Sequence, residues 1–340
     1  MDLLPDEAQQ EVIASTAALL AKELPVSRLR GSFGAGPERL ADSLWRTFAE
    51  LGWFGLGLAD DLGGVGFSAV EEVLLARELG RALAPPSVIA TLLAARCAAL
   101  APDGQRRDAL LRGTLRAGWV EPVGDAEIGS RVRGRFQLID AGGTQLLLVA
   151  NASGAALIDV VATGGEASAC LDDAVSLAAA SIDAPALALV PAAREPLALR
   201  AALLTAAALT GIAEAARDQA ARYANERVQF GKPIGVFQAI KHRCADMAVR
   251  AEVAWQQTAY AALALRESLT DAAFQVASAK ALAAQAALES SASNVQVHGG
   301  YGFTVEYDAQ LLVKRAHVYE RLAGSRTQQL AAVLVAPAPL

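Results

Sequence analysis

The sequence predicts a mainly α-helical protein with a small β domain in the middle of the chain. Hydrophobic residues make up 54% of its 340 residues, whereas aromatic residues make up only 5%. Alanine supplies much of the apolar fraction, which favours closely packed helices. Between residues 119 and 190 the sequence instead becomes rich in Val, Gly, Asp and Thr. A chain of this length can form two or three domains around a large core.

Charge and cysteine content argue against nucleic-acid binding and against a metal site. The net charge of −6 argues against nucleic acid as a partner. Cys97, Cys170 and Cys244 lie far apart and lack metal-site spacing, so we expect no metal and a reducing, cytoplasmic compartment.

Arg200 interrupts the most apolar stretch, and the N-terminus lacks the basic start of a signal peptide. We therefore expect no membrane span.

Residues 1–118 are predicted to form an N-terminal helical domain. Asp6 is placed to cap a helix over residues 7–24. A second helix is expected over residues 37–51, and Gly52 would end it.

A glycine-rich segment follows, over residues 53–66, and it is too rich in glycine to remain helical. Ser68 then has the pattern of an N-cap, with Glu71 three residues on completing a capping box. The helix that begins there should end near Arg81.

Residues 119–190 are predicted to form a reduced middle β domain. Two short apolar runs, residues 145–150 and 156–161, are set between Gly, Asn and Ser breaks and have the pattern of buried strands.

Residues 191–340 are predicted to form a C-terminal helical bundle. Apolar residues recur at helical spacing over five segments, which we expect to be residues 199–226, 237–267, 272–289, 306–322 and 324–335. A loop is expected over residues 296–303.

The break between the first two of these helices is the most informative stretch. Gly231 and Pro233 would end one helix and turn the chain back, holding Arg227, Lys232 and Gln238 near one another. A guanidinium fork beside an amide suits a ligand that carries phosphate. The alternative is a helix hairpin with ordinary surface charges.

Residues 227–238, Arg-x-x-Phe-Gly-x-Pro-Ile-x-x-Phe-Gln, resemble the flavin-binding turn of the acyl-CoA dehydrogenase family. Residues 296–303, Gln-Val-His-Gly-Gly-Tyr-Gly-Phe, are similar to that family's second flavin loop. The resemblance covers nearly the whole chain. It implies an N-terminal helical domain, a middle β domain and a C-terminal four-helix bundle that also makes dimer or tetramer contacts, in a homo- or hetero-oligomer.

In that family the turn and the second loop bind the pyrophosphate and adenosine part of an FAD whose ring lies in the neighbouring subunit. The resemblance therefore implies FAD as the cofactor. The residues it implies for binding are Arg227, Phe230, Gln238, Gln296, Gly299, Gly300, Ser325 and Thr327.

The catalytic base of the family is missing at both positions where members carry it. That base is a glutamate that removes the α-proton of an acyl-CoA while a hydride leaves the β-carbon for the flavin. The usual position falls on Ala323 and the alternative position on Ala201. The nearest acidic residues are Glu195 and Glu320.

The middle domain departs from the family pattern as well. Val120 stands where the family has a threonine that hydrogen-bonds the flavin ring, and residues 123–126 do not reproduce the loop that follows. The family's tryptophan loop is missing, and the chain is a few dozen residues shorter than usual members.

These departures together suggest a base-lacking subunit that helps to bind FAD beside a catalytic acyl-CoA dehydrogenase subunit. The complex would catalyse α,β-dehydrogenation of an acyl-CoA and pass electrons to an electron-accepting flavoprotein. Three alternatives stay open. They are a self-sufficient acyl-CoA dehydrogenase with its base relocated to Glu320, a non-enzymatic oligomerisation scaffold, and a flavin monooxygenase.

Overall fold

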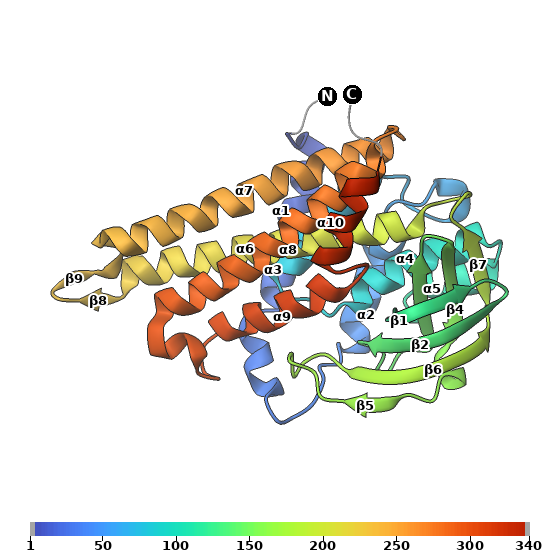
Figure 1. The fold of residues 1–340 in the computed structure, drawn as a ribbon, viewed down its shortest axis with the longest axis horizontal. Helices are drawn as coiled ribbons and strands as arrows, with labels where there is room; N and C mark the ends of the chain where they lie inside the picture. The colour runs from blue at the N-terminus through green and yellow to red at the C-terminus, as the bar shows by residue number, and fades with distance from the viewer. Residues whose placement is uncertain (1–3, 337–340) are drawn as a thin grey trace. The chain divides into compact units, whose positions relative to one another are not determined.

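The computed structural model describes residues 4–336. Helices dominate at both ends of the chain, and a single large sheet lies between them in the sequence (Figure 1). The fold class predicted from composition and pattern is therefore confirmed. The chain divides into two compact units, and neither is one continuous segment. The first comprises the described residues up to Phe33, Val73–Ala84 and those from Leu203 onward, and the second comprises Gly34–Glu72 and Pro85–Ala202.

The N-terminal part contains helices joined by short 3₁₀ turns. Asp6 accepts a hydrogen bond from the Gln9 amide at 2.9 Å, and the Gln9 side chain bonds back, so the first helix is capped as predicted. Ser68 and Glu71 form the second predicted box, with the Ser68 amide donating to Glu71 Oε2 at 2.8 Å. The elements are α1 (Glu7–Glu23), η1 (Val26–Ser32), α2 (Asp42–Glu50), η2 (Trp53–Gly55), η3 (Asp60–Leu62), α3 (Ala69–Arg81), α4 (Ser87–Leu100) and α5 (Gly104–Leu111).

The second helix is shorter than predicted, because it begins at Asp42 instead of residue 37. The preceding segment is bonded to other parts of the second unit. The Glu38 amide donates to the Ala174 carbonyl at 2.9 Å, and the Leu40 carbonyl accepts from Arg116 Nη1 at 3.0 Å. These long-range bonds replace the helical ones, and no pattern in the segment itself reveals them.

The middle of the chain forms a seven-stranded sheet in the order β5-β6-β2-β1-β3-β4-β7. Of its neighbouring pairs, β1 and β3 are parallel and the others are antiparallel. The two predicted strands are present as β3 and β4. The strands are β1 (Ala117–Ile128), β2 (Arg131–Ile139), β3 (Leu146–Asn151), β4 (Gly154–Asp159), β5 (Glu166–Ser168), β6 (Leu177–Pro185) and β7 (Ala188–Pro191), with a 3₁₀ turn η4 (Val160–Ala162) after β4.

The C-terminal helices form the core of the first unit. α6 passes so close to α3 that a Cβ atom on Gly211 would lie 1.9 Å from the Arg77 carbonyl oxygen. By length and composition α6 could cross a membrane, but 89% of its most apolar window is buried inside the protein. The elements are α6 (Leu197–Glu226), β8 (Val228–Gln229), β9 (Lys232–Pro233), η5 (Ile234–Val236), α7 (Gln238–Arg266), α8 (Ala272–His298), η6 (Gly299–Phe303), α9 (Ala309–Arg321) and α10 (Arg326–Val335).

The helix predicted to end at Glu289 instead runs to His298. Its polar residues Ser290, Ser291 and Asn294 are fully buried, so tertiary packing carries the helix through a stretch of weak helix formers. The predicted loop over residues 296–303 therefore starts only at residue 299.

Candidate functional site

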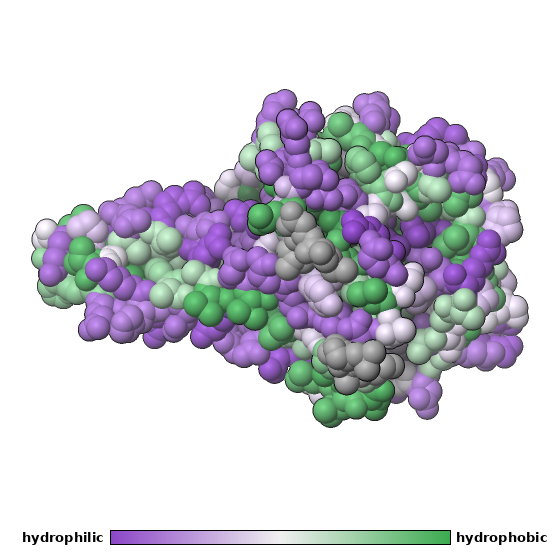
Figure 2. All heavy atoms as spheres, turned by 90° about the horizontal axis from the view of Figure 1, so that it is seen from above, coloured by the Kyte–Doolittle hydropathy of each residue, from purple (hydrophilic) through white to green (hydrophobic). Residues whose placement is uncertain are grey.

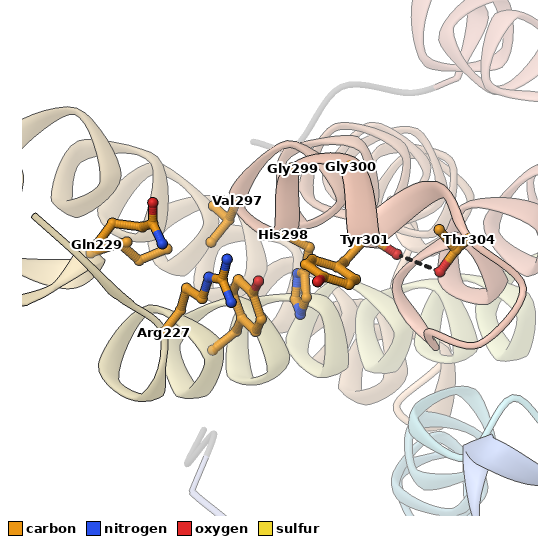
Figure 3. A pocket seen from close by; sticks show the side chains of 10 residues that line it. Arg227, Gln229, Val297, His298, Gly299, Gly300, Tyr301 and Thr304 are labelled. Atoms are coloured by element: carbon orange, nitrogen blue, oxygen red, sulfur yellow. Dashed lines mark hydrogen bonds between the residues drawn. The ribbon is translucent and has the colours of Figure 1, made fainter.

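The ends of α6 and α8 form a pocket of about 490 Å³ in the first unit. Figure 3 shows side chains from both helix ends turned toward it. Ten residues line it, namely Tyr223, Arg227, Gln229, Ile234, Val297, His298, Gly299, Gly300, Tyr301 and Thr304. Its volume lies within the range of small-molecule sites.

A tight hairpin fixes the position of Arg227. The Arg227 amide still bonds to the Tyr223 carbonyl at 2.9 Å, and its own carbonyl accepts from the Ile234 amide at 2.8 Å. Phe230 and Gly231 both have positive φ, at 52° and 75°, which is the conformation of a two-residue hairpin turn. Arg227 is thus held at the helix end, with its guanidinium 5.5 Å from the centre of the Tyr301 ring.

The tip of this hairpin is apolar and exposed. Phe230 is 90% exposed, and Val228 and Val236 are about half-exposed. Figure 2 shows apolar side chains in green among polar ones at this end of the α6–α7 pair.

Four aromatic rings pack together at the pocket. The Tyr223 and His298 rings stack with centroids 4.0 Å apart, and Tyr307 packs on both at steep angles. Tyr301 extends the cluster, because its ring centre lies 5.7 Å from that of Tyr307. The rings come from α6, α8, η6 and the segment before α9, so their packing connects the elements that form the pocket.

His298 is a neutral member of this cluster. Burial lowers the pKa of its imidazole, although the Asn294 carbonyl and Asp308 act in the opposite direction. His298 Nδ1 lies 2.9 Å from the Asn294 carbonyl oxygen, so Nδ1 carries the proton and donates. His298 is thus a hydrogen-bonded residue at the end of α8.

Glycines leave the backbone open beside the aromatic cluster. Gly299 has φ +62° and ψ −140°, a conformation that favours glycine. A Cβ atom on Gly299 or Gly300 would meet nothing within 4 Å, so a ligand has room to approach the backbone there. Gly302 has a different role, because its Cβ would lie 2.6 Å from the Val295 carbonyl oxygen.

The structure brings some of the sequence-predicted residues together and leaves others apart. Of the eight, Arg227, Gly299 and Gly300 line the pocket. The other five are not among the described residues that line it: Phe230, Gln238 and Gln296 are exposed, Ser325 caps α10, and Thr327 is exposed on α10.

The aromatic lining of this pocket is not among the residues that the sequence predicts for the site. The signal for Tyr223 is its position four residues before Arg227, which places both on one face of a helix. Tyr301 stands between two glycines of the predicted loop. No spacing in the sequence places His298 beside Tyr223, or Tyr307 behind these lining rings, because only the packing of the helices brings the rings together.

The turn between α9 and α10 carries no free acid. Ala323, which the sequence predicts to stand at the usual base position, has φ +54°, and its carbonyl accepts from Gln329 Nε2 at 2.8 Å. Glu320 Oε1 accepts from the Arg326 amide at 2.7 Å, and Oε2 lies 3.3 Å from Arg321 Nε. Glu320 therefore serves as an anchor for the start of α10.

Ala201, the residue predicted for the alternative base position, lies in the second unit beside a buried charge cluster. Ala201 is 1% exposed on α6. Its neighbour Arg200 pairs with the buried Glu72 and lies 3.3 Å from Glu195 Oε1, which also accepts from Arg96 Nε at 2.9 Å. Burial alone would lower the pKa of Arg200, but the two carboxylates more than offset it and raise the pKa. Glu195 is thus committed to two guanidinium groups.

Val120 points into the core of the sheet. It is 1% exposed and belongs to a buried apolar cluster with Phe136, Leu147 and Val149. It presents no hydrogen-bonding group, and its side chain is covered by its neighbours.

Comparisons with known proteins agree with this architecture. Residues 6–112 match the acyl-CoA dehydrogenase N-terminal domain, and residues 190–335 match the acyl-CoA dehydrogenase C-terminal domain. The chain is 32% identical over 332 residues to the acyl-CoA dehydrogenase IpdE2 of Mycobacterium tuberculosis, covering 96% of both chains. The chain therefore belongs to the acyl-CoA dehydrogenase family, the flavoprotein oxidoreductases that act on CH–CH bonds in acyl-CoA metabolism.

Solved structures of this class are similar over the whole chain. A variant of the Tcur3481-Tcur3483 steroid acyl-CoA dehydrogenase superposes with a TM-score of 0.83 at 25% identity, covering 96% of each chain. The ChsE4-ChsE5 complex of Mycobacterium tuberculosis gives the same TM-score and identity, covering 99% of this chain and 100% of that one.

Proposed function

We propose that this chain is the base-lacking subunit of a mixed acyl-CoA dehydrogenase complex and that it binds the pyrophosphate and adenosine end of FAD. The complex would catalyse α,β-dehydrogenation of an acyl-CoA thioester. One contrast carries the proposal: Arg227 and two open glycines share a pocket, whereas alanines stand at both base positions.

The pocket fits the dinucleotide end of FAD. The Arg227 guanidinium offers a planar fork of donors, which suits pyrophosphate oxygens. Gly299 and Gly300 leave their backbone open to a close ligand. FAD, when bound, supplies the acceptor for the hydride that leaves the acyl-CoA.

Other residues would complete the contact once a partner chain is present. Phe230 would pack against the cofactor, and the exposed amides of Gln238 and Gln296 would hydrogen-bond it. Ser325 and Thr327 would supply further contacts from the start of α10. These residues would bind and orient the cofactor, and they would take no part in proton transfer.

The base would come from the partner subunit. An effective general base needs a carboxylate free to face the α-carbon of the substrate in a dry site. Glu320 and Glu195 are instead bonded to a helix start and to arginines. Val120 offers nothing to a flavin ring, which is consistent with the ring lying in the partner subunit.

The relatives support a mixed assembly. One of the similar structures is a complex of ChsE4 with ChsE5. A similar curated protein, CarC of Acetobacterium woodii, is a subunit of a caffeyl-CoA reductase-Etf complex. By analogy we propose a catalytic acyl-CoA dehydrogenase subunit as partner, an electron-accepting flavoprotein as the next carrier, and a cytoplasmic location.

The test is to purify the chain with its partner from the native source and to measure bound FAD for the wild type and two variants. Losing the charge-assisted bonds of Arg227 should weaken FAD binding by roughly 10- to 150-fold in Arg227→Ala. Arg222→Ala is the matched control, because Arg222 is exposed on the same helix and does not line the pocket. Unchanged FAD content in Arg227→Ala, or oxidation of acyl-CoA by the wild-type chain alone, would contradict the proposal.

A further inference from the structure

Tyr301 differs from the other rings of the aromatic cluster in its exposure. It is 52% exposed, whereas His298 is 5% exposed and Tyr223 and Tyr307 are at least half-buried. Tyr301 also lines the pocket, as Figure 3 shows. Within the described part of the pocket it is the ring that offers a broad open surface to a ligand.

The ring is held in place from behind. Tyr307 lies against it at 5.7 Å, and Tyr307 in turn packs on the stacked Tyr223 and His298. The Tyr301 carbonyl accepts from both the amide and the hydroxyl of Thr304, at 3.1 Å each, which fixes the backbone of the turn. A ring oriented in advance loses little conformational entropy when a planar group stacks on it.

A cationic group lies over one face of the Tyr301 ring. The Arg227 guanidinium is 5.5 Å from the Tyr301 ring centre. A nucleotide presents the same pair of features, a flat base at one end and phosphate at the other. Aromatic rings next to cationic groups are the recurring means by which proteins hold bases without reading their sequence.

We propose that Tyr301 is the base-stacking residue of this pocket and makes it selective for a nucleotide over pyrophosphate alone. The inference rests on the proposed function, because it takes the ligand to be the adenosine diphosphate end of FAD. Arg227 then supplies affinity for phosphate, and Tyr301 supplies affinity for the base.

The experiment is calorimetric titration of the full chain, and of its complex with the partner after FAD has been removed, with ADP and with inorganic pyrophosphate. Removing a stacked base contact should weaken ADP binding by about 5- to 150-fold in Tyr301→Ala. Affinity for pyrophosphate should stay unchanged, and Tyr301→Phe should restore ADP binding because it keeps the ring. Arg227→Ala should weaken both ligands.

Phe303→Ala is the matched control. Phe303 is an 83% exposed aromatic residue in the same turn, and it does not line the pocket. Tyr301 is itself exposed, so its truncation leaves no buried cavity, and circular dichroism verifies the fold. Unchanged ADP affinity in Tyr301→Ala, an equal loss for ADP and pyrophosphate, or an equal loss in Phe303→Ala would overturn the inference.

The two proposals fail in different ways. If the wild-type complex holds FAD and Tyr301→Ala binds ADP normally, only the stacking role falls. If wild-type chain and complex bind neither FAD nor ADP, the proposed function falls and the stacking role falls with it.

Discussion

Substitution of Glu320 distinguishes a relocated catalytic base from a structural anchor, because the two roles predict opposite results. The Glu320 side chain is 13% exposed, and its Oε1 accepts from the Arg326 amide at the first residue of α10. A carboxylate at a helix N-terminus stabilises the helix through this bond and through the helix dipole. We therefore expect its role to be local to the turn between α9 and α10.

The magnitude follows from that geometry. Glu320→Ala removes a capping acceptor and should lower the free energy of unfolding by about 1–2 kcal/mol. Glu320→Gln keeps an acceptor oxygen and should cost roughly 0.5 kcal/mol or less. Ser325 remains in its own capping box with Gln328 in both variants, so α10 should still form.

The assay pairs urea unfolding of the chain with acyl-CoA turnover by the complex. An anchor predicts small losses of stability and normal turnover in Glu320→Gln. A general base predicts normal stability and a fall in turnover of about 100- to 10,000-fold. The second result would refute the reasoning and favour a self-sufficient enzyme.

Three further predictions concern the first unit. Gly211→Ala should lower the free energy of unfolding by about 1–3 kcal/mol, because the new Cβ would lie 1.9 Å from the Arg77 backbone. This cost outweighs the gain of up to about 1 kcal/mol that alanine brings to a helix. A thermal melt that shows stabilisation would contradict the close packing. Glu214→Ala should cost about 3 kcal/mol and Glu214→Gln less, because Glu214 is buried and bonds to both Arg77 and Arg81; equal melting temperatures would refute this. The lowered pKa of His298 means that the folded state binds the proton less readily than the unfolded state, so its contribution to stability is present above about pH 6.5 and is lost as pH falls toward the folded pKa. Melting temperatures between about pH 7.5 and pH 5 should therefore fall less steeply in His298→Gln than in the wild type, and parallel slopes would contradict the assignment.

Local chemistry made several elements predictable. Asp6 and Ser68 each begin a helix with a side-chain cap, and both caps depend on residues within three positions. The hairpin after α6 was likewise indicated by Gly231 and Pro233. Arg227 and the glycine pair could be assigned to one predicted site only through their resemblance to two family loops, since Gly299 follows Arg227 by 72 positions in the sequence.

Long-range packing sets the helix boundaries and side-chain roles that could not be predicted from the sequence. The sequence places the start of α2 too early because hydrogen bonds to the Ala174 carbonyl and from Arg116 hold the segment before it. The end of α8 was predicted too early because burial outweighs the weak helix preference of its serines. The roles of Glu320 and Glu195 depend on partners that only the fold brings near.

The most direct test of the account is the ratio of FAD to polypeptide in the assembly purified from the native source. If this chain supplies the dinucleotide-binding pocket to a flavin whose ring lies in a different subunit, the assembly will contain two kinds of chain and one FAD for every two chains. A homo-oligomer with one FAD per chain that oxidises acyl-CoA without a partner would contradict it.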